Sequence, residues 1–353
     1  MPLKTFSCRD FRCLTAAELL PHPAFTLIAG PNASGKTSLL EAIAYLGRGR
    51  SFRGAGTRDL VKHGNQEFLL RGVASYAGRD HSIGVSNGPD GLQQSIDGER
   101  GGGLAALADV LPLQVIDPAI HELVAGAPDG RRRFIDWMTF HVEQGYLAVW
   151  RRYRRALRQR NALLKDGASA LDSWDEELAA AGIEASEARQ RVLGRALPIV
   201  AASASQLLQA PVSFTYQRGW PKDVELRQAL TEGRRRDVQM GSTQQGPHRA
   251  DLKLQVDERV ARRLVSRGQQ KLLACAMVLG SVAVAAEALG RVPLLLLDDP
   301  AAELDSQSLA RLMAAVAGLE GQVVATALTA DAVPLPADLA MFHVEHGELV
   351  AGR

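Results

Sequence analysis

One octapeptide near the start of the chain has the residue types and spacing of a phosphate-binding loop. Residues 30–37 read Gly-Pro-Asn-Ala-Ser-Gly-Lys-Thr and fit the pattern GxxxxGK(S/T). Glycines let backbone N–H groups turn toward phosphate oxygens, and the N-terminus of a following helix adds partial positive charge. We expect Lys36 to reach the β- and γ-phosphates of a nucleotide and the Thr37 hydroxyl to coordinate Mg²⁺. The predicted nucleotide-binding residues are Gly30, Pro31, Asn32, Ala33, Ser34, Gly35, Lys36, Thr37 and Ser38.

A second segment places two carboxylates at the end of an apolar run. Residues 292–299 read Val-Pro-Leu-Leu-Leu-Leu-Asp-Asp. A buried strand of a parallel sheet has this composition, and ligands bind beyond the carboxyl ends of such strands. Asp298 is therefore expected to hold Mg²⁺ through water, and Asp299 to orient the attacking water. The predicted catalytic residues are Lys36, Asp298 and Asp299.

A phosphate-binding loop requires a strand before it and a helix after it. Residues 25–29 are apolar and stop at a glycine, as a buried strand would, and residues 3–6 form another strand-like run. Residues 37–46 carry an apolar stripe at helical spacing. This context disfavours an ordinary glycine-rich loop. The stripe consists of Leu39, Leu40, Ile43 and Leu46.

Two further regions precede the second acidic segment. Short alternating runs at 68–73, 82–85 and 113–116 predict a small antiparallel sheet. From about residue 129 to residue 209 the sequence is helical and rich in Arg and Ala, and it predicts an antiparallel helical hairpin. We expect turns at 166–167 and at Gly182, and a helix that is kinked or ended at Pro198. One face of the hairpin carries Tyr146, Trp150, Tyr153, Leu157 and Leu164.

Strand and helix patterns alternate toward the C-terminus. Strand-like runs at 212–216 and 252–256 are followed by a helix at 269–288, a strand at 292–297, a helix at 306–317 and a strand at 322–327. Such alternation predicts a parallel sheet. The predicted fold class is therefore α/β.

The composition indicates a soluble globular protein. The 353 residues are 46% hydrophobic and 23% charged, and the net charge is +2. Any basic surface must therefore come from local clustering. The apolar stretch 272–289 is interrupted by Ser281 and Glu287, so we expect no membrane span. The first residues lack the pattern of a signal peptide and the three cysteines lack metal-binding spacing, which predicts a cytoplasmic protein with reduced thiols.

Two weaker motifs gain meaning from their order. Residues 264–271, Leu-Val-Ser-Arg-Gly-Gln-Gln-Lys, resemble the LSGGQ signature of ABC-type ATPases, although Ser266 alone could be a simple helix cap. Residues 301–305, Ala-Ala-Glu-Leu-Asp, resemble the D-loop that follows the second acidic strand in those proteins. The order of the motifs separates ABC-type heads from GTPases and small-molecule kinases. Because the chain has no NKxD motif, we expect the nucleotide to be ATP.

Further motifs extend the resemblance to one family. Residues 11–14, 39–43, 47–53, 131–136, 158–161 and 246–252 occur in the order seen in RecF, a family of bacterial DNA replication and repair proteins with SMC-like heads. This resemblance covers essentially the full length. It implies an ABC-type ATPase head, lobe I, with a mixed sheet and helices, formed by 1–118 and 240–353. An inserted, mainly helical lobe II would occupy 119–239. The alternative is an ABC-type ATPase that acts on a protein client.

The resemblance also implies how the chain works. ATP and Mg²⁺ are the expected cofactors, and ATP would be held between two protomers, so that the homodimer clamps single-stranded, double-stranded or gapped DNA. RecR and RecO are the implied partners in loading RecA, and slow, DNA-stimulated hydrolysis would release the DNA. The expected location is the cytoplasm, in association with the nucleoid. The signature residues, acting on the partner's nucleotide, are Ser266, Arg267, Gly268 and Gln269, and the D-loop residues are Glu303 and Asp305.

Several positions depart from the wider ABC pattern. Asp299 stands where the catalytic residue is usually Glu, which suits a slow switch. Arg267 replaces a signature glycine, as in RecF proteins. Residues 326–329 read Thr-Ala-Leu-Thr where a switch histidine often follows the last strand, so no γ-phosphate sensor is assigned. Gln114, near a strand end, is the candidate Q-loop residue and metal contact.

Arginines crowd the predicted helical hairpin. With the family resemblance we expect some of them to contact DNA phosphates, with strong salt dependence and little base readout. A solvated helix face is the alternative, and glutamates at 176, 177, 184 and 187 offer internal ion pairs. His248 and Asp251 have no nucleophile nearby in sequence and are expected to be structural. The predicted DNA contacts are Arg131, Arg132, Arg151, Arg152 and Arg155.

Overall fold

The chain divides into two compact units. The protein is represented by a computed structural model that describes residues 3–165, 171–345 and 347–351. Unit 1 consists of Met1–Ile120 and Gly290–Arg353, and unit 2 consists of His121–Leu289.

Residues 240–289 fall in unit 2, whereas the predicted lobe II ends at residue 239; the lobe boundaries stay a prediction. Helix α10 (Arg267–Leu289) packs against α7 (Leu171–Leu208) and α5 (Pro128–Val142). The absence of a side chain at Gly280 allows this close approach, since a Cβ there would lie 2.8 Å from Val200 Cγ2. The signature segment is therefore built on a core helix of unit 2.

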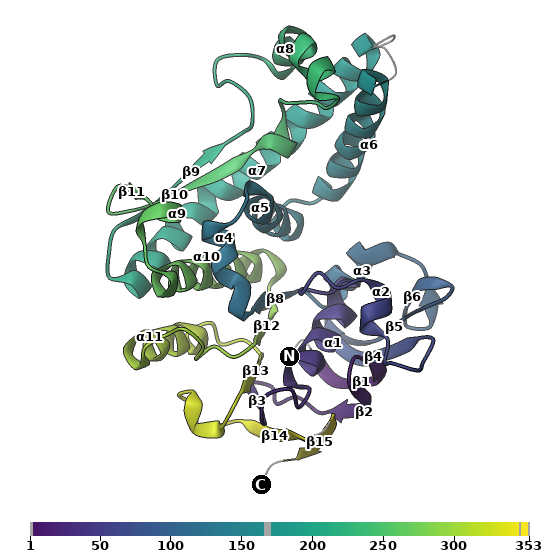
Figure 1. Cartoon of the computed structure of the whole chain (residues 1–353), viewed down its shortest axis with the longest axis vertical. Helices are drawn as coiled ribbons and strands as arrows, with labels where there is room; N and C mark the ends of the chain where they lie inside the picture. The colour runs from purple at the N-terminus through teal and green to yellow at the C-terminus, as the bar shows by residue number, and fades with distance from the viewer. Residues whose placement is uncertain (1–2, 166–170, 346, 352–353) are drawn as a thin grey trace. The chain divides into compact units, whose positions relative to one another are not determined.

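A mainly parallel sheet brings several strand ends to one edge of unit 1 (Figure 1). Its strand order is β15-β14-β3-β13-β12-β8, and β15 alone of the six described strands pairs antiparallel. Strands β3, β8, β12 and β13 are buried at every position, as continuous apolar runs predict for a sheet covered on both faces. The strands are β3 (Phe25–Ala29), β8 (Leu113–Ile116), β12 (Leu294–Leu297), β13 (Val323–Ala327), β14 (Ala340–Glu345) and β15 (Glu348–Ala351).

A second, antiparallel sheet in unit 1 has the strand order β2-β1-β4-β5-β6-β7. Helix α1 (Lys36–Arg48) is buried from residue 38 to residue 47 and shares one core with strands of both sheets. Most of the buried side chains of α1 are apolar, and the buried carboxylate of Glu41 is paired with Arg12. The strands are β1 (Leu3–Phe11), β2 (Leu14–Leu19), β4 (Phe68–Tyr76), β5 (Arg79–Gly88), β6 (Gly91–Ile96) and β7 (Glu99–Arg100); the other helices are α2 (Thr57–Leu60), α3 (Gly103–Val110), α11 (Ser306–Ala317) and the 3-10 turn η3 (Ala330–Ala332).

Unit 2 is mainly helical. Helices α6 (Tyr146–Lys165) and α7 pack against each other, as a helical hairpin requires. Tyr153 of α6 lies in the same small core as Leu178 of α7 and Leu226 of α8. The remaining elements are η1 (Pro118–His121), at the boundary between the units, α4 (Glu122–Ala125), α8 (Leu226–Met240), η2 (Pro247–Arg249), α9 (Ala261–Leu264) and an antiparallel sheet of β9 (Val212–Gln217), β10 (Asp251–Val256) and β11 (Arg259–Val260).

Two local predictions are wrong, and α7 does not end at Pro198. Leu113–Ile116 belongs to the parallel sheet, where it pairs with β12, because it is buried on both faces. Gly182 lies inside α7 and marks a close contact instead of a turn. Helix α7 also continues through Pro198 to Leu208; the carbonyl group that Pro198 leaves without a partner is on exposed Gly194, where water can bind it. The turn predicted at 166–167 lies outside the described residues.

One described helix, α10, is long and apolar enough to cross a membrane by length and composition alone. Most of its apolar window is buried inside unit 2, where residues 271–282 are buried without interruption. That burial accounts for its composition as a core helix of a folded domain.

Gly182 and Gly194 form a matched pair in α7 that tests the packing of unit 2. A Cβ at Gly182 would lie 2.6 Å from Leu226 Cδ2 and 3.1 Å from the Tyr153 ring, whereas a Cβ at Gly194 meets nothing within 4 Å. We expect Gly194→Ala to stabilise the protein by about 0.5–1 kcal/mol, since alanine favours the helix. Gly182→Ala should destabilise it instead, by about 1–3 kcal/mol, because the core is already filled. Urea unfolding of both variants checks this, and a stabilised Gly182→Ala would contradict the packing described.

Candidate functional site

The phosphate-binding loop joins β3 to α1, as predicted. Its backbone is unusual, since φ is 63° at Ala33 and 116° at Gly35, the residue before α1. Such conformations turn successive N–H groups toward one side of the loop. The Lys36 Nζ donates to the carbonyl oxygens of Gly30 at 2.6 Å and of Pro31 at 2.7 Å. The ammonium therefore lies over the loop whose N–H groups would cradle phosphate.

Asp298 is a buried carboxylate at the end of β12, and it is 5% exposed. Thr37 Oγ1 lies 3.0 Å from both of its carboxylate oxygens, and Thr326 Oγ1 donates to Oδ1 at 2.7 Å. The Thr326 hydroxyl also accepts from the Asp299 N–H at 3.0 Å. Because β12 and β13 pair in parallel and end together, one hydroxyl of β13 positions both acidic residues. The structure thus brings Thr37, Asp298 and Asp299 together, although 261 residues separate Thr37 from Asp298.

Burial shifts the protonation equilibria of these groups. It raises the pKa of Asp298; hydrogen bonds from Thr326 and Thr37 oppose that shift, and the charge of Asp299 adds to it. Burial also lowers the pKa of Lys36, and the charges of Asp299 and Asp298 oppose this change. Interactions of these charges with a bound polyphosphate are stronger than in water, because the surroundings screen them less.

The oxygen atoms around Asp298 fit a Mg²⁺ ion. Mg²⁺ prefers oxygen ligands and is commonly held by one or two carboxylates together with substrate phosphates. The Thr37 hydroxyl and the Asp298 carboxylate are already in contact and would supply the protein's share. Across residues 3–165, 171–345 and 347–351, no group of three or more His, Cys, Asp or Glu side chains is arranged to hold a metal. The phosphates of a bound nucleotide would supply further oxygen ligands.

Gln114 does not belong to this site. It pairs in register with Leu295, three residues before Asp298, and its Oε1 accepts from Arg48 at 3.0 Å. Burial lowers the pKa of Arg48 to about 10. The prediction that Gln114 contacts the metal is therefore wrong, because its side-chain oxygen accepts a hydrogen bond from the guanidinium of Arg48. The residue at the end of β8 is Asp117, whose pKa is raised by burial and by the charge of Asp298.

The signature residues form the N-terminus of α10. The Ser266 N–H donates to Gln269 Oε1 at 2.9 Å, and the Gln269 N–H donates to Ser266 Oγ at 3.3 Å. This reciprocal pair is a capping box, so Ser266 does cap the helix, which is the simpler interpretation of this motif. Ser266, Arg267 and Gln269 are exposed. The cap leaves the positive end of a 23-residue helix at the surface of unit 2.

The D-loop residues precede α11 in unit 1. Asp305 caps this helix by accepting from the Ser308 N–H at 2.8 Å and from the Ser308 hydroxyl at 2.9 Å, and the backbone bond lowers its pKa. Glu303 is exposed and has φ of 65°. Asp305 therefore has a structural function that the motif alone did not indicate.

Two of the predicted DNA-contact arginines are engaged within the protein. Arg131 is 3% exposed, and its guanidinium donates to the two carboxylate oxygens of Asp251 at 2.7 and 3.2 Å. The prediction that Arg131 contacts DNA phosphates is therefore wrong, because this side chain is buried and paired with Asp251. Arg132 is partly buried and donates to the Ala250 carbonyl at 3.0 Å. Both arginines tie α5 to the start of β10.

The other three lie on α6. Arg152 pairs with Glu177 at 3.2 Å and with Glu184 at 3.0 Å on α7, so the ion pairs anticipated from the sequence are present. Arg151 and Arg155 are exposed, and within the part of the chain that the structure describes neither forms an ion pair. These two arginines present uncompensated charge to solvent.

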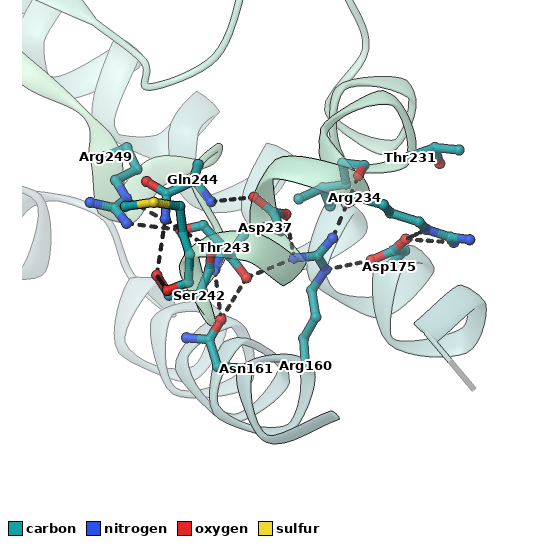
Figure 2. A network of polar contacts seen from close by, with 12 residues as sticks. Arg160, Asn161, Asp175, Thr231, Arg234, Asp237, Ser242, Thr243, Gln244 and Arg249 are labelled. Atoms are coloured by element: carbon teal, nitrogen blue, oxygen red, sulfur yellow. Dashed lines mark hydrogen bonds and ion pairs between the residues drawn. The ribbon is translucent and has the colours of Figure 1, made fainter. Parts of the chain in front are cut away.

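A neighbouring arginine of the same helix has a different role (Figure 2). Arg160 is fully buried, and it donates to Asp175 at 2.5 Å and to Asp237 at 2.7 Å. It also donates to Thr243 Oγ1 at 2.9 Å, while the Asn161 side-chain oxygen accepts from the Thr243 N–H at 2.9 Å. The network connects α6, α7 and α8 with the segment before β10. Arg160 and Asn161 of the motif at 158–161 therefore fix helix packing, since removing one partner would leave a buried charge unpaired.

His248 is structural, as expected. Its Nδ1 lies 2.5 Å from the Tyr153 hydroxyl and its Nε2 lies 2.9 Å from the Thr243 carbonyl oxygen. Burial lowers the pKa of His248 to about 4, so the ring is neutral at pH 7, with the proton on Nε2 facing the carbonyl. Both ring nitrogens are thus committed to neighbours within unit 2.

Two residues that help to position the site, Thr326 and Glu41, were not predicted from the sequence. Thr326 was noted only as part of a segment without a switch histidine, although its place at the end of a predicted parallel strand could have indicated contact with Asp298. Glu41 is fully buried in α1 and accepts two hydrogen bonds from Arg12, each at 3.0 Å. This pair connects the turn between β1 and β2 to the helix that carries Lys36.

Thr326→Val removes the hydroxyl that positions Asp298 and Asp299 while keeping the side-chain shape. Hydrogen bonds to charged groups contribute about 1.5–3 kcal/mol, so we expect ATP hydrolysis to fall by about tenfold or more. Thr326→Ser keeps the hydroxyl and is the matched control. Steady-state hydrolysis with Mg²⁺ measures both variants, and equal rates for the Val and Ser variants would contradict this role.

Comparison with known proteins places the chain in a family. The family model described as RecF/RecN/SMC N terminal domain matches residues 2–347. A DNA replication and repair protein RecF from Pseudomonas fluorescens strain Pf-5 is 38% identical over 359 residues, covering 99% of this chain and 98% of the relative. RecF from Chromohalobacter salexigens is 38% identical over 360 residues, covering 99% of each chain.

Solved structures agree with the sequence comparison. A structure of the recombination mediator protein RecF with ATP in the RecFOR pathway has a TM-score of 0.88 and 26% identity, covering 100% of this chain and 98% of that one. A structure of the same mediator protein with ATPrS gives 0.87 and 26%, covering 99% and 98%. An Smc head with a domain of ScpA, at 16% identity and a TM-score of 0.63, shows the shared fold. The chain belongs to the RecF proteins of the RecF/RecN/SMC family and has their ABC-type ATPase fold.

Proposed function

We propose that the chain is an ATP-driven DNA-binding switch of DNA replication and recombinational repair. The observation that carries this proposal is the cluster in which Thr37 and Thr326 hold the buried Asp298 beside the phosphate-binding loop. The names of the relatives support the biological setting, since they are DNA replication and repair proteins. The similar structures with ATP support the choice of nucleotide.

The nucleotide would be bound as Mg²⁺–ATP, with the phosphates on the loop N–H groups and the N-terminus of α1. The Lys36 ammonium donates to neutral loop carbonyls, and phosphate oxygens would add the attraction of an opposite charge to such hydrogen bonds. Mg²⁺ would supply charge neutralisation between the phosphates and the Thr37–Asp298 pair. Asp299 would orient water; its carboxylate is one methylene shorter than the usual Glu, which suits slow hydrolysis.

Dimerisation would complete each nucleotide site. The capped N-terminus of α10 is exposed and positive, so Ser266, Arg267, Gly268 and Gln269 of one protomer could contact the γ-phosphate held by the other. Glu303 and Asp305 would lie in the same interface. ATP would therefore favour the dimer, and hydrolysis would release it. These steps follow the family's pattern.

DNA would bind through its phosphates, because the exposed charge lies on arginines without base-reading motifs. Arg151, Arg155 and Arg158 recur at four and three residues along α6, which places them on one exposed stripe. DNA would stimulate the weak ATPase, and RecO and RecR would be the partners in loading RecA. Binding of a clamp to gapped or junction DNA would place the protein at sites of repair.

Fluorescence anisotropy of a labelled gapped duplex, titrated at two salt concentrations, tests the proposal. With ATP and Mg²⁺ we expect tight binding that weakens steeply with salt, because phosphate contacts release counterions. Without ATP, binding should be much weaker. Absence of binding in both states would leave the nucleotide site in place and point to a protein client.

The arginine stripe gives this experiment a matched set of variants. Replacing both Arg151 and Arg155 with Ala should lower affinity at every sequence and reduce the magnitude of the salt slope by about 2. Arg152→Ala is the control on the same helix, since Glu177 and Glu184 already offset its charge. An equal effect of the control and the double variant would rule out the stripe as the phosphate contact.

Asp299→Asn separates ATP binding from hydrolysis. The amide keeps the size of the side chain and removes the charge that orients water, so hydrolysis should fall by about 10²-fold while ATP still binds. The DNA complex should then persist, and the dissociation rate of labelled duplex after a chase with unlabelled DNA measures this. If hydrolysis falls and DNA leaves at the rate seen with the unmodified protein, hydrolysis is not the release step.

A further inference from the structure

A C-terminal hairpin lies directly against the phosphate-binding loop. Strands β14 and β15 form it, and β14 pairs in parallel with β3, the strand that ends at the loop (Figure 1). His343 of β14 is in register with Ala29, the last residue of β3. The residues that follow in each strand therefore run side by side, and the turn of the hairpin reaches the loop itself.

The contact between β14 and the phosphate-binding loop requires glycine, which has no side chain, in the loop. A Cβ at Gly30 would overlap the Val344 carbonyl oxygen, and a Cβ at Gly35 would lie 3.5 Å from Val344 Cγ1. The same Cβ at Gly35 would lie 3.2 Å from Sγ of Cys13, in the turn between β1 and β2. Gly30 thus faces the backbone of β14, and Gly35 faces the side chains of Cys13 and Val344, in addition to any role toward phosphate.

The hairpin also makes a directed bond to the loop. The Gly347 N–H donates to the Ser34 carbonyl oxygen at 3.0 Å. Gly347 has φ of 81°, and a Cβ there would lie 2.8 Å from the Cys13 carbonyl oxygen. Glycine is required for both reasons, because its backbone adopts this conformation readily and the turn has no room for a side chain.

The core of unit 1 fixes the position of the hairpin. Val344 is 1% exposed and belongs to the main core cluster, and Phe342 and Leu349 pack against the same cluster. The loop backbone, by contrast, is held in left-handed conformations at Ala33 and Gly35. Such conformations persist where surrounding structure determines them.

We propose that the β14–β15 hairpin is a positioning element for nucleotide binding, in which Val344 and Gly347 hold the loop in its phosphate-binding form. This inference rests on the proposed binding of ATP at residues 30–37. Neither residue needs to touch the nucleotide, and Gly347 acts through the Ser34 carbonyl. The P-loop motif is therefore incomplete without a segment more than 300 residues later in the chain.

Gly347→Ala and Gly91→Ala form a matched test. Gly347 directly precedes β15 and Gly91 is the first residue of β6, so both lie where a hairpin turn of unit 1 meets its second strand; their φ angles are 81° and 79°, but a Cβ at Gly91 meets nothing within 4 Å. Both variants should lose thermal stability through backbone strain. Only Gly347→Ala should weaken binding of ribose-labelled ATP, by about tenfold or more, while Gly91→Ala stays within about twofold of the unmodified protein.

The outcomes separate the inference from the function on which it rests. Equal ATP affinities for the two variants, with tight binding by the unmodified protein, would overturn the positioning role. Failure of the unmodified protein to bind ATP would contradict the proposed function and the inference together. Titration well below the unfolding temperature keeps a loss of stability from being mistaken for a loss of affinity.

Hydrogen exchange on the unmodified protein decides the question if Gly347→Ala does not fold. ATP should slow amide exchange in the peptide that contains Gly347 together with the peptide that contains residues 30–37, because the two share a hydrogen bond. Protection of the loop peptide with unchanged exchange at Gly347 would overturn the inference.

Discussion

The Asp298 carboxylate lies where its ionised form is disfavoured by burial, and two threonine hydroxyls from distant segments offset that cost. One hydroxyl comes from the first turn of α1 and the other from β13. Both reach the same carboxylate because β3, β13 and β12 are neighbours in a parallel sheet and end at the same edge. The sheet order and the interior position of α1 therefore bring these groups together, and Asp299 is the next residue of the chain.

The arginines of unit 2 include a buried group and an exposed group. Arg131 and Arg160 are buried with carboxylates and fix the packing of helices, whereas Arg151 and Arg155 are exposed on α6. Exposed charge is weakly held by the protein and remains available to a polyanion. If the chain binds DNA as proposed, substitutions in the buried group would act by destabilising the fold and substitutions in the exposed group by removing phosphate contacts, so stability and salt dependence must be measured together.

The local motifs and the strand–helix alternation could be predicted from the sequence, because the phosphate-binding loop and the acidic strand depend on residue type at fixed spacing. Phe25–Ala29 and Ser306–Ala317 occur at the residues predicted for a strand and a helix. Position relative to other segments could not be predicted. Whether an arginine on a helix is buried depends on carboxylates far away in sequence, which is why Arg131 was misassigned. The hydrogen bond from Arg48 to Gln114 likewise joins residues far apart in the sequence, so the metal contact predicted at Gln114 was wrong. The turn predicted at Gly182 was wrong because a close helix contact and a turn both favour glycine.

Sedimentation velocity of the unmodified protein at micromolar concentration tests the central claim, that ATP binding controls assembly. We expect a monomer without nucleotide and with ADP, and a dimer with ATP and Mg²⁺, because only the γ-phosphate would connect one protomer's loop to the other's signature residues. A monomer under all three conditions would contradict it, since no composite nucleotide site could then form.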